Sequence, residues 1–151
     1  MRSKLIKDFL VYIEDCHKAL ADLYQRLGEE ASIRKTKLLL EYMKNREEIS
    51  YLHLHKYIKH APVSLLDTLL DNFFDQSFPQ QCKALQLKTD LELEDIVTLA
   101  IQLDMQLIEV MRAAADSSPT VEAETAIGNL TSKEEEALYQ VVMASHEFEY
   151  L

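Results

Sequence analysis

Five ionisable side chains lie on the mainly apolar faces of four predicted long helices. They are Glu14 and His17 in the first helix, Glu47 in the second, Asp104 in the third and His146 in the fourth. Burying an unpaired carboxylate or imidazolium is costly, so several in one interior must compensate one another, bind a metal ion or face a solvated cavity. Two neighbouring cations need bridging carboxylates and neutral imidazoles. The pattern therefore predicts a metal site or the remains of one.

Apolar residues that recur at intervals of three and four predict the helices that position these side chains. The four long helices are expected over residues 5–27, 32–60, 92–116 and 131–151. Gly28 and Pro62 are expected to end the first two of them. Two short helices are expected in the connections, over residues 64–74 and 118–128, because each of these stretches begins with capping residues or proline.

The lengths of the connections predict an all-α four-helix bundle. Short links make the first two helices antiparallel neighbours, and likewise the last two, whereas the connector between the pairs is long enough to cross the whole bundle. The chain has 151 residues, with only 2 glycines and 3 prolines, all of which fall between the periodic segments. We expect one domain over residues 1–151, because no repeat or second boundary is visible.

Composition excludes several partners. The net charge of −10 and the isoelectric point near 4.9 argue against nucleic acid, which requires a basic surface. The apolar run at residues 9–13 is too short for a signal sequence or a membrane span. Cys16 and Cys82 are too few for a disulfide framework and are expected to be buried as small hydrophobic residues. We expect a cytoplasmic protein.

The five candidate site residues differ in how strongly the pattern supports them. Glu47 and Asp104 have apolar residues both one turn before and one turn after them, which favours an inward position. Glu14 lies at the edge of its apolar stripe, where an acid can swing to solvent. His17 and His146, taken singly, are more typical of core or boundary histidines than of ligands. These two histidines are candidate ligands because the other candidate residues accompany them.

Other ionisable residues fit a structural interpretation. His53 and His55 are two positions apart and therefore point to different helical faces; together with His60 they are interpreted as surface residues. The acidic run at residues 134–136 is assigned to a helix N-terminus, where negative charge is favourable. No function is expected of it.

The helix order, the long crossover and the sequence Ala100-Ile101-Gln102-Leu103-Asp104 resemble the ferritin-like and rubrerythrin-like superfamily. The resemblance covers nearly the whole chain. It implies a di-metal site with one glutamate from each of two helices and a Glu-x-x-His pair from each of the other two.

Four residues match that motif position by position. Glu14 corresponds to the single glutamate of the first helix. Asp104 takes the glutamate position of the third helix with a side chain one methylene shorter. Glu47 corresponds to the acid of the second-helix pair, and His146 to the histidine of the fourth-helix pair.

Two of the six implied ligands are absent, because Ser50 stands in place of a histidine and Met143 in place of an acid. His17 lies one turn from Glu14 and could supply the missing imidazole. A neutral thioether cannot bridge hard cations, so an intact di-iron oxidase is disfavoured. The surviving groups could instead form a buried hydrogen-bonded network, in which Glu14 or Glu47 has a raised pKa and is held by His17 or His146.

Three functions follow from this resemblance and these residues. The favoured one is a non-catalytic interaction or structural module, a homodimer through a helix face, with an eroded site that binds at most one metal ion weakly. The alternative is a non-haem iron or manganese oxidoreductase, or an iron-handling protein of rubrerythrin type, using the five candidate residues. A weaker option, binding of an apolar ligand between the helices, would require a pocket of several hundred cubic ångströms.

Overall fold

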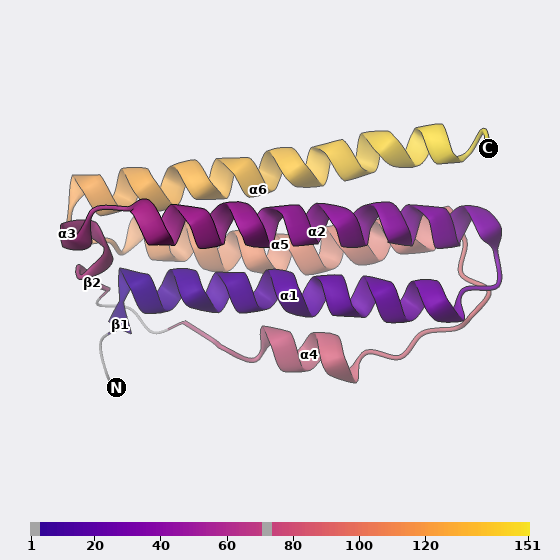
Figure 1. Cartoon of the computed structure of the whole chain (residues 1–151), viewed down its shortest axis with the longest axis horizontal. Helices are drawn as coiled ribbons and strands as arrows, with labels where there is room; N and C mark the ends of the chain where they lie inside the picture. Colours follow the sequence, from indigo (N-terminus) through magenta and orange to yellow (C-terminus); the bar gives the residue numbers. More distant parts are fainter. Residues whose placement is uncertain (1–3, 71–73) are drawn as a thin grey trace.

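The computed structural model of the chain describes residues 4–70 and 74–151. Its four long helices are α1 (Ile6–Glu30), α2 (Arg34–His60), α5 (Leu93–Asp116) and α6 (Val121–Phe148). Figure 1 shows them side by side along the long axis of the molecule, with the crossover between α2 and α5 returning along the bundle. The predicted all-α four-helix bundle with one long crossover is confirmed.

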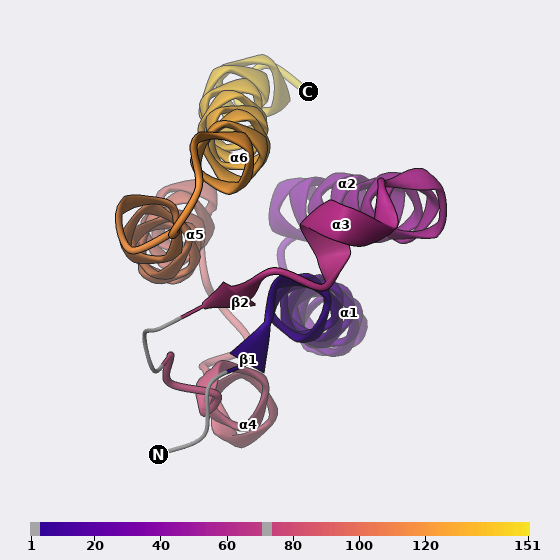
Figure 2. The same cartoon turned by 90° about the vertical axis from the view of Figure 1, so that its left-hand side faces the viewer.

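The long helices form two hairpins. Figure 2, which looks along the bundle, shows α1 beside α2 and α5 beside α6. The core between them contains side chains with almost no exposed surface, among them Phe9, Ile13, Leu40, Ile96 and Ile127. In α1 the buried residues recur at intervals of three and four, so burial of one apolar face stabilises the helix.

The described residues of the crossover form two short helices and one strand. These are α3 (Val63–Leu66), β2 (Leu69–Leu70) and α4 (Phe78–Ala84). β2 pairs antiparallel with β1 (Lys4–Leu5). The helix predicted over residues 64–74 therefore ends early at Leu66, and residues 71–73 of that prediction lie outside the described residues.

Contacts with α1 hold the crossover in place. The ring of Phe74 packs edge-on against Phe9, with centroids 4.9 Å apart. The Arg26 guanidinium donates hydrogen bonds to the carbonyls of Leu85 and Cys82, near the end of α4. These long-range contacts, rather than local periodicity, determine the structure of this segment.

The predicted start of the last helix at residue 131 is wrong, because α6 runs without interruption from Val121 to Phe148. Its N-cap is Thr120, whose Oγ1 accepts a hydrogen bond from the Ala123 amide. Thr131 is instead inside the helix, where its hydroxyl donates to the Ile127 carbonyl at 2.7 Å. Burial of the face that includes Ile127 offsets the weak helix propensity of the intervening glycine.

This longer helix changes which face of α6 is buried. Ala123, Ile127, Thr131, Val141 and Ser145 face the core. The stripe predicted to face inward is exposed, with Tyr139, Met143 and Tyr150 exposing 64%, 49% and 86% of their surface. The face of α6 that the sequence of residues 131–151 alone predicts to be buried is therefore its outer face.

Replacing Gly128 with alanine is expected to raise the free energy of unfolding by about 0.5–1 kcal/mol, because glycine is a poor residue in a helix interior. Beyond the nearby backbone of its own helix, a Cβ atom at Gly128 would have no described atom within 4 Å. Chemical denaturation followed by circular dichroism measures the change. Gly28→Ala is the matched variant near a helix end, where the gain should be smaller. Destabilisation by Gly128→Ala would contradict a continuous α6.

In the described parts of the chain, none of the helices combines the length and apolar character that crossing a bilayer requires.

Candidate functional site

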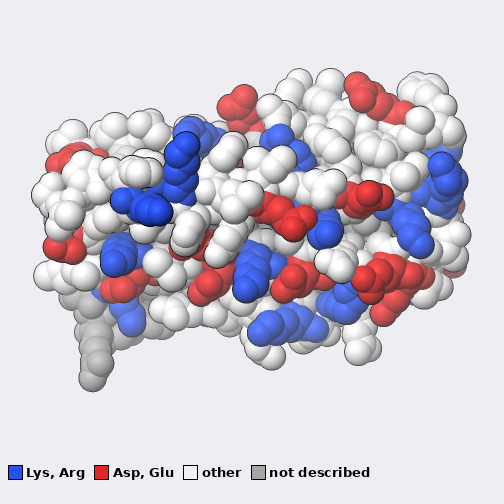
Figure 3. Space-filling model, in the orientation of Figure 1, with Lys and Arg blue, Asp and Glu red and all other residues white. Residues whose placement is uncertain are grey.

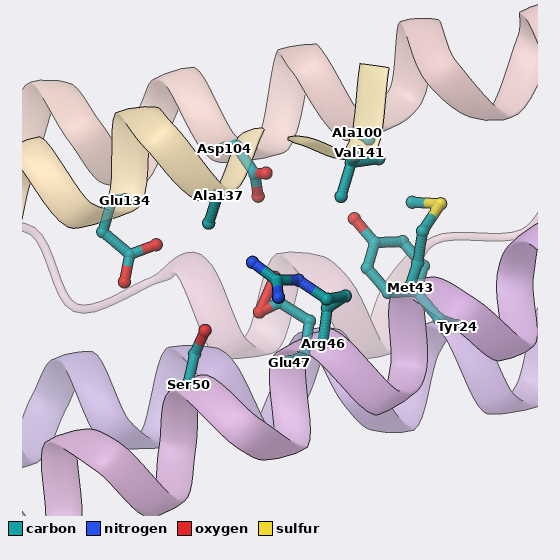
Figure 4. A pocket seen from close by; sticks show the side chains of 10 residues that line it. All are labelled: Tyr24, Met43, Arg46, Glu47, Ser50, Ala100, Asp104, Glu134, Ala137 and Val141. Atoms are coloured by element: carbon teal, nitrogen blue, oxygen red, sulfur yellow. The ribbon is translucent and has the colours of Figure 1, made fainter. Parts of the chain in front are cut away.

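One side chain from each long helix reaches a common polar centre in the bundle. His17 comes from α1, Glu47 from α2, Asp104 from α5 and Glu134 from α6. Figure 4 shows the three carboxylates around the cavity that they line. The prediction that Glu47 and Asp104 face inward toward the same point is confirmed.

His17 lies between two carboxylates. Its Nδ1 is 2.9 Å from Glu47 Oε2, and its Nε2 is 2.7 Å from Glu134 Oε1. Only 1% of His17 is exposed. An imidazole donates from both ring nitrogens only when it is protonated, so this geometry favours the imidazolium. Burial by itself would lower the pKa of His17, but attraction to Glu134 and Glu47 outweighs burial and raises the pKa well above its ordinary value.

Two carboxyl groups of the centre, those of Asp104 and Glu47, are shifted toward their neutral forms. Burial raises the pKa of Asp104 well above its ordinary value, and the charges of Glu47 and Glu134 raise it further, against the opposing effect of His17. Burial likewise raises the pKa of Glu47, although His17 opposes this. Three acids face two positive groups, the His17 imidazolium and the Arg46 guanidinium, which also lines the cavity and lowers the pKa of Glu47. Burial still dominates at Asp104, so the centre favours the protonated form of that carboxyl.

The cavity between these groups has a volume of about 10 Å³, which is space for roughly one water molecule. The Tyr24 side chain, 2% exposed, also lines it. Its hydroxyl is buried and has no hydrogen-bond partner within the described parts of the chain. Burial, followed by the charges of Asp104 and Glu47, raises the pKa of Tyr24 well above its ordinary value, so the hydroxyl stays protonated.

Glu14 does not reach this centre. Its carboxylate is buried between α1 and α2, where Oε2 lies 2.8 Å from Nδ1 of His55. It is one helical turn from His17, yet its carboxylate contacts His55 of α2 and does not line the cavity. His55 is exposed as predicted, but the prediction assigned it no partner.

His146 does not reach the centre either. Its side chain is on the exposed face of α6, in the last turn of the helix, and its predicted inward position is wrong because the register of α6 was misjudged. Met143 is on the same exposed face. Ser50, in contrast, lines the central cavity, at the place where the superfamily motif implies an imidazole.

Glu134 is the site residue that the sequence interpretation missed, because the residues 134–136 were assigned to a helix start. With α6 beginning at Val121, Glu134 is in the middle of the helix. It then follows Ile127 and Leu130 by seven and four positions and precedes Val141 by seven, the spacing of one helical face. That spacing would have indicated an inward acid once the correct helix start was known.

The donor groups do not fit a di-iron centre. Both nitrogens of His17 are occupied by carboxylate oxygens, and a protonated imidazole has no lone pair for a metal ion. Asp104 is the one carboxylate of the centre that faces no imidazole at hydrogen-bond distance. Across residues 4–70 and 74–151, no group of three or more His, Cys, Asp and Glu side chains is arranged to hold a metal ion.

Comparisons with known proteins point to the same architecture. No protein-family model and no curated protein matches the sequence. Among solved structures, the chain is similar to a protein from Thermotoga maritima described as a candidate ferritin-like diiron-carboxylate protein. The two share 16% sequence identity and superpose with a TM-score of 0.63, over 97% of this chain and 98% of the other. At this identity the similarity shows the fold and does not assign an activity.

Proposed function

Starting from the ferritin-like fold of this chain, we propose that it is a non-catalytic bundle protein with a reduced carboxylate centre that binds at most one metal ion, weakly. The observation that carries this proposal is the position of His17 between Glu47 and Glu134. Its imidazolium supplies, inside the bundle, the positive charge that converging carboxylates require. Because His17 belongs to the chain, this positive charge does not depend on a bound ion.

The energetic argument concerns what an incoming metal ion would have to displace. A cation binding to Glu47 or Glu134 would repel the imidazolium and would have to break one of its charge-assisted hydrogen bonds, which are among the stronger interactions in proteins. The remaining carboxyl, Asp104, is shifted toward its neutral form and is then a poor ligand. Metal affinity is reduced by both effects.

A specific observation supports the alternative, an iron or manganese oxidoreductase or iron-handling protein. Glu47, Asp104 and Glu134 converge from three helices on one cavity, and Tyr24 presents to it a hydroxyl that has no hydrogen-bond partner among residues 4–70 and 74–151. Converging oxygen ligands suit hard cations. On this alternative, His17 would lose its proton and rotate when metal binds.

Metal analysis distinguishes the two functions. Protein purified from cells grown with excess iron or manganese is expected to contain less than one metal ion per chain. Any weakly bound metal detected by titration should be lost in Asp104→Ala, because that variant removes the carboxylate not committed to His17. Glu109→Ala, which removes an exposed acid of α5, should leave metal binding unchanged. Two tightly bound metal ions per chain would refute the proposal and support the oxidoreductase.

The proposal extends to assembly and compartment. The exposed side chains of Tyr139 and Met143 on α6, with Tyr150 just beyond the end of the helix, offer an apolar face for a second copy of the chain, in keeping with a homodimer. Cys16 and Cys82 are both buried free thiols, and burial raises the pKa of each to about 12. Unreactive thiols of this kind suit a reducing cytoplasm.

A further inference from the structure

A long groove separates α2 from α6 on the side of the bundle away from the crossover. It has a volume of about 710 Å³, within the roughly 300–1,000 Å³ of typical small-molecule sites. On α2 it is lined at intervals from Arg46 to His60, a distance of about 21 Å along the helix. Its dimensions therefore suit an elongated ligand.

The groove has an apolar floor. Leu10 and Ile13 of α1, Leu54 of α2 and Met111 of α5 all line it and are otherwise buried in the core. Leu130 of α6 lines the opposite wall. A ligand lying over these side chains would remove its own apolar surface from water. That removal is the main source of affinity for a hydrocarbon chain.

Basic side chains line the groove although the protein as a whole carries a net charge of −10. Arg46, Lys56 and Lys133 border it, and none of them forms an ion pair within the described parts of the chain. Of the two acids in the lining, Glu134 is held by His17 and Glu136 is exposed. Figure 3 shows blue side chains on this face, over the C-terminal half of α2.

Arg46 occupies a special position at one end of the groove. It lines both the groove and the central carboxylate cavity, as Figure 4 shows for the cavity. One of its guanidinium nitrogens, Nη2, donates to Oε1 of Gln140 across the gap between α2 and α6. Its Nε is buried and has no partner among the described residues. Because Nε is shielded from solvent, a ligand carboxylate would contact the part of the Arg46 side chain that lines the groove, where a charge-assisted hydrogen bond is among the stronger interactions in proteins.

We propose that this groove binds a free long-chain fatty acid. The carboxylate pairs with the Arg46 guanidinium, and the alkyl chain lies along α2 over the floor formed by Leu10, Leu54 and Met111. Lys56 and Lys133 border the groove and attract the anion. The ligand contacts need neither Asp104 nor His17, although Arg46 lines the carboxylate cavity as well as the groove.

Palmitate is the probe for this proposal, measured by its displacement of a fluorescent fatty acid from the intact protein. We expect saturable binding of one palmitate per chain. Arg46→Gln should weaken it by about tenfold, the effect of losing a charge-assisted hydrogen bond, and Lys133→Gln by a smaller factor. Lys59→Gln, which removes an exposed charge of α2 outside the groove, should leave the affinity unchanged.

A change of ligand keeps the test decisive even if Arg46→Gln fails to fold, which circular dichroism would reveal. The methyl ester of palmitic acid keeps the chain but has no charge, and octanoate keeps the charge but has a short chain. Both should bind the unaltered protein more weakly than palmitate. The proposal is overturned if palmitate does not bind saturably, if the ester binds equally well, or if the protein binds anionic vesicles but not free palmitate.

Discussion

Replacing His17 with alanine is expected to lower the free energy of unfolding at pH 7 by about 3–5 kcal/mol, the range for removing one partner of a buried ion pair. His17 contacts Glu47 and Glu134 through its two ring nitrogens. Without it, both carboxylates lose their positive partner while they remain mostly shielded from water. Urea denaturation at several pH values measures the loss.

Two further variants show whether charge or lost packing causes that destabilisation. His53→Ala removes an exposed histidine of α2 and should cost less than about 0.5 kcal/mol, as is usual for surface substitutions. Adding Glu47→Gln and Glu134→Gln to His17→Ala neutralises the acids left behind and should recover much of the lost stability. If the triple variant is no more stable than His17→Ala, the imidazolium does not balance these carboxylates.

The second prediction is that the stability of this protein falls as the pH rises from about 5 to 8. The folded-state pKa values of Asp104, Glu47 and His17 are all raised above their ordinary values. The folded state therefore holds more protons than the unfolded state, so each group's stabilisation is complete below its ordinary pKa and is lost as the pH rises through the folded pKa. One such proton corresponds to a slope of about 1.4 kcal/mol per pH unit.

Asp104→Asn tests the origin of this slope, because the amide keeps the shape of the neutral carboxyl and removes its titration. Glu47, Glu134, His17, Arg46 and Tyr24 are the charged or titratable groups that act on Asp104 or share its cavity. The variant should show a shallower pH dependence and should be more stable than the unaltered protein at pH 8, by about 1–2 kcal/mol. Asp116→Asn, at the exposed end of α5, is the matched control. Parallel pH profiles for the unaltered protein and Asp104→Asn would contradict the prediction.

The fold could be predicted because the long helices carry strong local signals. The start of α5 was placed within one residue of Leu93, and the end of α2 at His60 before Pro62. The segment between them was harder, because Phe74 and Arg26 hold it through partners distant in sequence. Such contacts leave no periodic pattern.

The site could be predicted only in part, for the same reason. Glu47 and Asp104 were identified because apolar residues a turn before and after them leave an acid no route to solvent. His146 was misplaced and Glu134 missed through a single error, the start of α6. The sequence places Glu14 at the edge of its apolar stripe, where it could face solvent; it is in fact buried, and its partner is His55. Neither spacing nor composition indicates which neighbour a buried acid will pair with.

Each hairpin contributes half of the polar centre: His17 and Glu47 come from α1 and α2, and Asp104 and Glu134 from α5 and α6. Contacts within a hairpin are close in sequence and can form early, whereas the two halves of the centre meet only when the hairpins dock. Dehydration of these charges is then a late event on the folding pathway. We therefore expect substitutions at the centre to alter the rate of unfolding more than the rate of folding, so the centre governs how long the folded bundle persists.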